Sequence, residues 1–429
     1  MKMWSVKRID EIGKIITGKT PSSNYPDEFG LKYPFITPSD IPNTQKHISV
    51  ERFLSEKGME SHKRIKLPPK TICVVCIGAT IGKVCTTTVY SFSNQQINNI
   101  IPNKENDPDF VYYLASTLKD ALVSFAGGAA TPIVNKSVFS LIKVLVPVKD
   151  CQRKISAILS AYDELIENNN RRIAILENMA EEIYREWFVR MRFPGHEKVK
   201  VVKGVPEGWE IKKIGDICSK ITDGSHLSPE YFLNGKPMAS VKDMNSYGFS
   251  LDNIKTISEK DFEKLKKADC KPITNDILIA KDGSYLKHVF VWDYDIDIVI
   301  LSSIAILRPD TNIIKPYFLS HTLKQDSTKA MMAGFVSGSA LPRIILNDFK
   351  KMKLLIPTSD IIDDFDSFVN PLYQSIKVKL LTNSKLKKSR DLLLPRLISG
   401  KLDVEKLDIA FPPGMQSHDP TEGKEAEAA

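Results

Sequence analysis

The stretch Trp4-Ser-Val-Lys-Arg-Ile-Asp-Glu-Ile12 returns later in the chain as Trp209-Glu-Ile-Lys-Lys-Ile-Gly-Asp-Ile217, an offset of 205 residues. Because a chance similarity would not keep many positions in order, we interpret the chain as a duplication of one ancestral unit. Two unrelated α/β domains with similar edge motifs are the alternative. Further matches are Ile16-Thr17 with Ile221-Thr222 at the same offset, and Val144–Pro147 with Leu354–Pro357 at an offset of 210.

The composition is that of an ordinary globular protein. The chain has 429 residues, 42% hydrophobic and 26% charged, which suggests two or three domains. No apolar run is long enough for a membrane span, and no signal peptide is visible. The six cysteines follow no disulfide spacing, so we expect a reducing, cytoplasmic location. The net charge of +8 is compatible with a polyanionic partner, and equally with a slightly basic soluble protein.

Each copy contains the signals of a mixed α/β domain. Apolar runs of strand length occur at 72–77 in the first copy and at 277–280 and 298–307 in the second. Helical stretches at 110–125 and 317–333 precede a glycine-rich loop and a final strand. We therefore predict two copies of a mixed α+β domain.

A heptad pattern follows each copy. From Ile155 the seam residues recur at steps of four and three for more than four heptads, which is typical of a supercoiling helix. The second copy shows the pattern 210 residues later, with Pro371 predicting a kink or restart and Ser399-Gly400 predicting the helix end. The predicted seam residues are Leu159, Tyr162, Ile166, Asn169, Ile173, Leu176, Ile183 and Trp187, then Val369, Leu372, Ile376, Lys379, Leu386 and Leu393.

The two helices need partners, because neither can bury its apolar stripe alone. The economical solution is an antiparallel coiled coil between them, which gives the molecule a pseudo-two-fold internal repeat. The alternative is that each seam binds another subunit. The predicted boundaries are 1–150 for the first domain, 151–192 for the first helix, 193–206 for a linker, 207–358 for the second domain, 359–400 for the second helix, and 401–429 for a tail that is disordered from about residue 411.

A search for catalytic motifs finds none. Gly78-Ala-Thr-Ile-Gly-Lys-Val84 resembles a phosphate-binding loop but has three residues between its glycines, and Val84 stands where a hydroxyl should bind magnesium. Cys73 and Cys76 form a single CxxC without the second pair that a zinc ribbon needs. The histidines lack metal-ligand spacing, and no Gly-x-Ser-x-Gly occurs. We predict no catalytic residue, no metal site and no cofactor bound by this chain.

The order of these elements resembles that of the specificity subunits of type I restriction-modification systems. The two Trp-led openings look like the family's module starts. Ile158-Leu-Ser-Ala-Tyr-Asp-Glu-Leu-Ile-Glu-Asn168 resembles its central conserved helix, and Leu392-Leu-Leu-Pro-Arg-Leu-Ile-Ser-Gly-Lys-Leu402 resembles its distal one. The resemblance covers residues 1 to about 410, and the order and duplication of these motifs make it strong.

The resemblance implies a non-catalytic DNA-recognition subunit. Each target recognition domain would read one half of a bipartite, asymmetric site in double-stranded DNA, and the coiled coil would separate the halves. Two methylation subunits would dock on the helices and bring S-adenosylmethionine, and restriction subunits would add ATP- and magnesium-dependent translocation and cleavage. Trp187-Phe188 and Leu397-Ile398 differ between the helices, so the two docking surfaces need not be equivalent.

Polar side chains on the loops of the two domains are the candidate DNA contacts, because amides pair with adenine and basic groups with guanine. For any one of them, a solvated loop residue is the alternative. The candidates are Lys19, Thr20, Thr80, Lys83, Gln95, Gln96, Thr131 and Lys136 in the first domain, and Ser225, His226, Lys242, Lys281, Ser284, Lys287, Ser339 and Arg343 in the second.

Two other functions are compatible with the sequence. One is a restriction or methylation enzyme with an unrecognised catalytic site, which would show cleavage or methylation without partners. The other is a tandem coiled-coil adaptor for proteins, which would show no salt-dependent binding to DNA.

Overall fold

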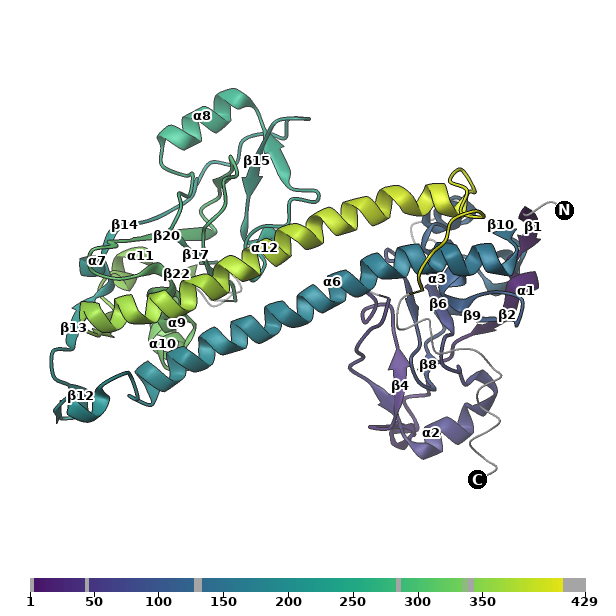
Figure 1. Ribbon diagram of the computed structural model, residues 1–429, viewed down its shortest axis with the longest axis horizontal. Helices are drawn as coiled ribbons and strands as arrows, with labels where there is room; N and C mark the ends of the chain where they lie inside the picture. Colours follow the sequence, from purple (N-terminus) through teal and green to yellow (C-terminus); the bar gives the residue numbers. More distant parts are fainter. Residues whose placement is uncertain are drawn as a thin grey trace. The chain divides into compact units, whose positions relative to one another are not determined.

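The structure is a computed structural model that describes residues 4–42, 46–126, 133–282, 287–334, 336–337 and 343–411. The chain divides into two compact units (Figure 1). Unit 1 comprises Met1–Arg171 with Lys379–Ala429, and unit 2 comprises Arg172–Val378. We call residues 4–147 module 1 and residues 209–356 module 2; each unit holds one module and one end of each of two long helices.

Module 1 is built around a four-stranded antiparallel sheet in the order β2-β9-β6-β7. A second sheet, β3-β5-β4-β8, contains one parallel pair, β4 with β8, and β1 pairs with β10. The strands are β1 (Trp4–Arg8), β2 (Gly13–Thr17), β3 (Phe29–Gly30), β4 (Tyr33–Ile36), β5 (Phe53–Leu54), β6 (Ile72–Val75), β7 (Val84–Thr86), β8 (Phe92–Ser93), β9 (Ile97–Pro102) and β10 (Lys143–Pro147).

Short helices flank the sheets of module 1. They are α1 (Ile9–Ile12), α2 (Glu56–Ser61), α3 (Pro108–Ser116), α4 (Lys119–Phe125) and α5 (Lys136–Leu141). Asp107 caps α3 by accepting the backbone N–H of Phe110 at 2.9 Å. The single helix predicted for 110–125 is two helices, because α3 ends at Ser116 and α4 begins three residues later. Phe110 and Tyr113 of α3 are buried in the core.

Module 2 repeats this topology. Its main sheet has the order β14-β20-β17-β18, β15 pairs in parallel with β19, and β13 pairs with β23. The match in strand order confirms the duplication. The elements are β13 (Glu210–Lys213), α7 (Ile214–Ile217), β14 (Cys218–Asp223), β15 (Lys236–Ala239), β16 (Lys255–Ile257), α8 (Glu259–Lys267), β17 (Ile277–Ala280), β18 (Val289–Val291), β19 (Val299–Ile300), β20 (Ile304–Pro309), α9 (Pro316–Lys324), α10 (Asp326–Ala333), β21 (Val336–Ser337), β22 (Arg343–Ile344), α11 (Leu346–Phe349) and β23 (Lys353–Ile356).

An irregularity in β14 changes the offset between the two repeats at this strand from the 205 residues that the sequence gives. The register of β14 against β20 shifts between Cys218 and Lys220. Such a bulge adds one residue to a strand. The offset of 205 places Thr17 on Thr222, but the structural equivalent of Thr17 is Asp223. Accordingly Gly18 N donates to Ile97 O, and Gly224 N donates to the equivalent Ile304 O.

The two long helices are α6 (Lys149–Tyr184), continued by the π-helical turn η3 (Arg185–Val189), and α12 (Ser359–Ile398). They pair in antiparallel fashion in each unit, as predicted. In unit 1, Asp163 of α6 contacts Arg390 of α12 and Asn169 contacts Asn383. In unit 2, Trp187 contacts Phe365 at 6.1 Å between ring centroids. None of the fourteen predicted seam residues is exposed.

The polar layer of the helix pair consists of asparagines. Asn169 Nδ2 donates to Asn383 Oδ1 at 2.9 Å, and Asn383 Nδ2 donates to Asn170 Oδ1 at 2.8 Å. The partner of Asn169 is therefore Asn383 and not its repeat equivalent Lys379, because antiparallel register decides which residues meet. The kink or restart predicted at Pro371 is wrong, because α12 runs through it. Pro371 is exposed, so water can satisfy the carbonyl group that lacks a helical partner.

The segment after each helix packs on the module of its own unit. In unit 2, the predicted linker 193–206 contains η4 (His196–Lys198), β11 (Val201–Val202) and β12 (Val205–Pro206), and the Phe193 ring lies 5.3 Å from Trp209. In unit 1, Gly400 adopts a φ of +72° against Trp4, Val404 is buried, and Lys154 Nζ donates to Glu405 O at 2.6 Å. The tail from residue 412 lies outside the described residues.

Each module meets the helix pair through a different set of groups. In unit 1, the Tyr113 hydroxyl donates to Asp163 Oδ2, and Arg390 Nη1 donates to Asp163 Oδ1, both at 2.6 Å. In unit 2, His321 of α9 stands at the position equivalent to Tyr113. Its ring stacks on Tyr184 at 5.5 Å, and its Nε2 lies 3.0 Å from the Tyr373 hydroxyl.

The environment of His321 predicts a pH-dependent stability. Burial, with a smaller contribution from Lys324, lowers the pKa of His321 to about 3. Since an unfolded histidine has a pKa near 6.5, the unfolded chain binds the extra proton below that pH and the folded chain does not. The free energy of unfolding should therefore be unaffected by His321 above about pH 6.5 and lower by about 2 kcal/mol at pH 5.

Urea denaturation at pH 7.5 and pH 5 checks this expectation in the wild-type chain and in His321→Gln. The glutamine amide can still bond to Tyr373 but does not titrate. Between pH 7.5 and pH 5, the free energy of unfolding should fall by about 2 kcal/mol less in the variant than in the wild type. An equal loss in both proteins would mean that His321 does not carry the effect.

Candidate nucleic-acid interface

Four segments of module 1 meet at one end of the sheet β2-β9-β6-β7. They are the end of β2 with the residues that follow it, the β6–β7 hairpin, the turn before β9 and the segment that leads into the start of α5. Backbone hydrogen bonds join them: Cys76 N donates to Gln96 O at 2.8 Å, and Val134 N donates to Cys76 O at 2.9 Å. The sequence-predicted residues of module 1 that the structure describes all lie on these segments.

Thr20 and Gln95 form a polar pair on this end of module 1. Thr20 Oγ1 donates to Gln95 Oε1 at 2.6 Å, which leaves the amide N–H groups of the exposed Gln95 available. Lys19 and Lys136 are exposed beside them, the latter at the start of α5. This set combines an amide that can pair with a base edge and cations that can contact phosphates.

Other predicted residues of module 1 are engaged within the protein. Lys83 is half-buried, and its Nζ donates to Ile41 O at 2.8 Å. Gln96 Oε1 accepts Asn94 Nδ2 at 3.1 Å. Thr80 is half-buried on the β6–β7 hairpin. Thr131 lies outside the described residues.

Sequence reasoning missed Asn98 and Asn99, which brace the same end from inside β9. Asn98 Oδ1 accepts the Thr17 hydroxyl at 2.7 Å, and Asn99 Nδ2 donates to Ile16 O at 2.9 Å. Both asparagines are buried. Two adjacent amides in an otherwise apolar strand of the sequence Ile97-Asn-Asn-Ile-Ile101 were the signal that could have found them.

Module 2 repeats the same backbone framework. Lys281 N donates to Ser303 O at 2.9 Å, and Ile344 N donates to Lys281 O at 3.2 Å. These bonds are the equivalents of the two that Cys76 makes in module 1. The same fold thus presents a different set of side chains at the same place.

Two of the residues predicted to contact DNA in module 2 are buried and bonded within the protein. The Lys281 side chain is 5% exposed and forms an ion pair with Asp223, which is 16% exposed. Ser225 is buried, and its hydroxyl donates to Leu227 O at 2.7 Å. His226 is the exposed member of this group: its side chain is 70% exposed, and its Nε2 lies 3.3 Å from Asp223 Oδ1. Its position is equivalent to that of Thr20.

The remaining predicted residues of module 2 are dispersed. Lys242 is exposed on the 3-10 turn η5 (Val241–Asp243), and Lys287 is exposed at the end of the β17–β18 hairpin. The backbone of Arg343 pairs with Ser337 in the ribbon β21-β22, and its side chain is not described. Ser284 and Ser339 lie outside the described residues.

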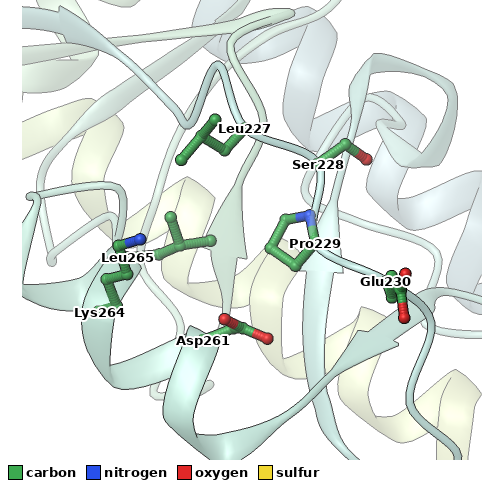
Figure 2. A pocket seen from close by; sticks show the side chains of 7 residues that line it. All are labelled: Leu227, Ser228, Pro229, Glu230, Asp261, Lys264 and Leu265. Atoms are coloured by element: carbon green, nitrogen blue, oxygen red, sulfur yellow. The ribbon is translucent and has the colours of Figure 1, made fainter.

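A surface hollow of about 400 Å³ lies beside His226, between the loop 227–230 and α8. Figure 2 shows Leu227 and Pro229 on the loop side, and Asp261, Lys264 and Leu265 on the helix side. Its lining is partly apolar and carries charges of both signs.

Across the described parts of the chain, no three His, Cys, Asp or Glu side chains are grouped to hold a metal ion. None of the helices described is at once long and apolar enough to cross a membrane.

Comparison with known proteins identifies the family. The model of the type I restriction modification DNA specificity domain matches residues 1–178 and again residues 206–383. The chain belongs to the type I restriction-modification specificity subunits. The two matches fall on the two copies that the repeat and the sheet topology define, so this specificity subunit has two DNA specificity domains.

Individual relatives agree with this assignment. The specificity subunit is 32% identical over 424 residues to the type I restriction enzyme MjaIX specificity subunit of Methanocaldococcus jannaschii, covering 95% of each chain. It is 34% identical over 188 residues to the HindI specificity subunit of Haemophilus influenzae, covering 41% of this chain and 39% of that one. The solved S subunit of M. genitalium shares the fold, with a TM-score of 0.56 and 18% identity over 92% of this chain and 96% of that one.

Proposed function

We propose that this specificity subunit reads a bipartite, asymmetric site in double-stranded DNA, with module 1 on one half-site and module 2 on the other. The observation that supports this is that one equivalent position holds different polar side chains: Thr20, bonded to Gln95, in module 1, and His226, beside Asp223, in module 2. A common framework with unlike polar groups should select unlike bases. The full site should therefore not be palindromic.

Exposed cations would hold DNA against these groups. Lys19 and Lys136 in module 1, and Lys242 and Lys287 in module 2, are exposed. We assign them to phosphates, which position a protein on the duplex without selecting a sequence. Binding should weaken steeply as salt concentration rises. Thr80, Thr131, Ser284, Ser339 and Arg343 stay candidates for further contacts.

The outer faces of the two helices are proposed to bind two methylation subunits. Each unit exposes large apolar side chains there, which water-facing helices normally avoid in such numbers. In unit 1 these are Leu165, Leu381 and Leu392, and in unit 2 they are Ile175, Met179, Phe368 and Val378.

Catalysis is proposed to reside in the partner subunits. The relatives are specificity subunits by name, which supports a non-catalytic role for this chain. Methylation subunits would bind S-adenosylmethionine, and restriction subunits would bind ATP and magnesium, all within the cytoplasm. The purified chain alone should neither methylate nor cleave DNA. Methylation should appear when the cognate methylation subunit and S-adenosylmethionine are added.

Mapping methylated adenines in the genome of cells that express the chain with its cognate methylation subunits tests the proposal. The expected result is one bipartite motif with two different halves and a spacer of fixed length. A motif without a spacer, or one with two identical halves, would refute it.

Replacing Gln95 with alanine should relax one base position in the half-site of module 1. Loss of an amide pair with a base edge should reduce discrimination there by roughly 5- to 100-fold. The measurement is the methylation rate on duplexes that carry single-base changes. Lys136→Ala is the matched control: a lost phosphate contact should slow methylation of all duplexes alike. Equal effects of Gln95→Ala in both half-sites would contradict the assignment.

A further inference from the structure

The ion pair between Lys281 and Asp223 lies directly behind the exposed His226. Asp223 ends β14 and Lys281 follows β17, so their side chains join two strands of the main sheet. One oxygen of the carboxylate binds Lys281, and the other lies 3.3 Å from His226 Nε2. The exposed fraction rises along this chain of contacts, from 5% at Lys281 through 16% at Asp223 to 70% at His226.

The fold does not require this ion pair. In module 1 the equivalent positions hold Thr17 and Cys76, and Thr17 makes a neutral hydrogen bond to Asn98 at 2.7 Å. The same backbone bonds form there without any charge. A buried ion pair contributes little net stability, because desolvation of the two ions offsets their attraction. Its presence in module 2 alone therefore points to a role in that module's recognition surface.

The backbone next to His226 is held by hydrogen bonds and close packing. The Asp223 carboxylate therefore has to orient only the side chain of His226. A Cβ at Gly224 would lie 2.1 Å from Ile300 O, which admits only glycine. Ser225 N donates to Ile300 O at 2.8 Å, and Ser302 N donates to Ser225 O at 2.9 Å. The remaining freedom of His226 is the rotation of its ring, and Asp223 restricts that rotation.

The contact also favours one of the two tautomers of the neutral ring. A carboxylate accepts hydrogen bonds, so it favours the tautomer with a proton on Nε2. In the neutral ring, Nδ1 is then an acceptor directed away from Asp223. In the major groove an acceptor pairs with the exocyclic amino group of adenine or cytosine, and not with the carbonyl oxygens of guanine or thymine.

We propose that Asp223, held by Lys281, is a positioning residue that fixes the ring of His226 so that Nδ1 reads an amino group of adenine or cytosine in the half-site of module 2. This inference rests on the proposed function of the two modules. It also gives Lys281 a role different from the direct DNA contact that its position in the sequence predicts.

Methylation by the full chain with its methylation subunits, measured on duplexes that carry every single-base change, tests this inference. His226→Ala should reduce discrimination by roughly five- to tenfold at one position of one half-site. Asp223→Ala with Lys281→Met removes both charges together and should relax the same position to a similar degree. The triple variant should be no worse than His226→Ala, because all three residues act through one contact.

Two further variants guard against a general structural effect. Asp223→Asn with Lys281→Gln keeps an acceptor beside His226 without leaving Lys281 unpaired, and it should give a smaller loss at the same position. Asp216→Ala removes an exposed carboxylate from α7, at the opposite end of β14, and should leave discrimination unchanged.

Wild-type discrimination in the Asp223 and Lys281 double variant, beside a loss in His226→Ala, would overturn the positioning role. An even loss over all duplexes in His226→Ala would overturn base reading by His226. Relaxation of both half-sites together by His226→Ala would instead refute the assignment of one module to each half-site.

Discussion

Deleting residues 170–176 from α6 and the facing residues 376–382 from α12 should abolish methylation of the native site. Each deletion is one heptad, so the apolar seam stays in phase while the helices shorten by about 10 Å at 1.5 Å per residue. That length corresponds to roughly three base pairs. Any sequence that is still methylated should carry a shorter spacer between the same two half-sites.

The deletion removes the contact of Asn170 with Asn383 and the ion pair of Lys377 with Asp293, but it keeps other contacts within each unit. It leaves Asn169 with Asn383, Tyr247 with Glu177, and His321 with Tyr373. The matched control replaces the same segments by another heptad of equal length with the seam residues retained, and it should keep the native site. Continued methylation of the native site by the shortened chain would show that the helices do not set the spacer.

Replacing Arg390 with methionine should lower the free energy of unfolding by about 2 to 4 kcal/mol. The Arg390 and Asp163 side chains are 12% and 19% exposed, so the substitution leaves a largely buried carboxylate without its cation. Burial lowers the pKa of Arg390, but the Asp163 carboxylate outweighs this effect and raises that pKa above its usual range, so the guanidinium keeps its charge. Urea denaturation of the full chain measures the loss.

The double variant Asp163→Asn with Arg390→Met separates the lost attraction from the stranded charge. It should be more stable than Arg390→Met alone, because no buried charge remains unpaired. Arg396→Met is the control, since Arg396 is exposed on the same helix and should change the stability by less than about 0.5 kcal/mol. Equal losses for Arg390→Met and Arg396→Met would show that the ion pair does not stabilise the packing of α6 against α12.

Much of the fold could be predicted from the sequence because it depends on periodicity. The duplicated Trp-led openings, the strand-length run at 72–77 and the heptad steps from Ile155 are local patterns that one chemical rule converts into strands or helices. The continuity of α12 through Pro371 could not be predicted in this way. Tertiary packing of Val369 and Leu372 on either side overrides the local preference of proline.

The recognition surface could be predicted only in outline. Loop position identified Thr20, Gln95 and His226 as candidate contacts, but it did not show which polar residues have partners within the protein. Lys281 and Lys83 are engaged by groups 58 and 42 residues away in the sequence. Such partners depend on how the strands pair in the sheet, which the sequence does not show. In β14, one bulge makes Asp223 the structural equivalent of Thr17, whereas the offset of 205 residues pairs Thr17 with Thr222.

The most direct test of the account compares Gln95→Ala with His226→Ala on one panel of duplexes with single-base changes in both halves of the methylated site. The two residues occupy corresponding ends of the two modules. We predict a double dissociation: the first variant relaxes a base in one half-site only, and the second relaxes a base in the other half-site only. Relaxation of the same half-site by both variants would contradict the division of the DNA site between two copies of one module.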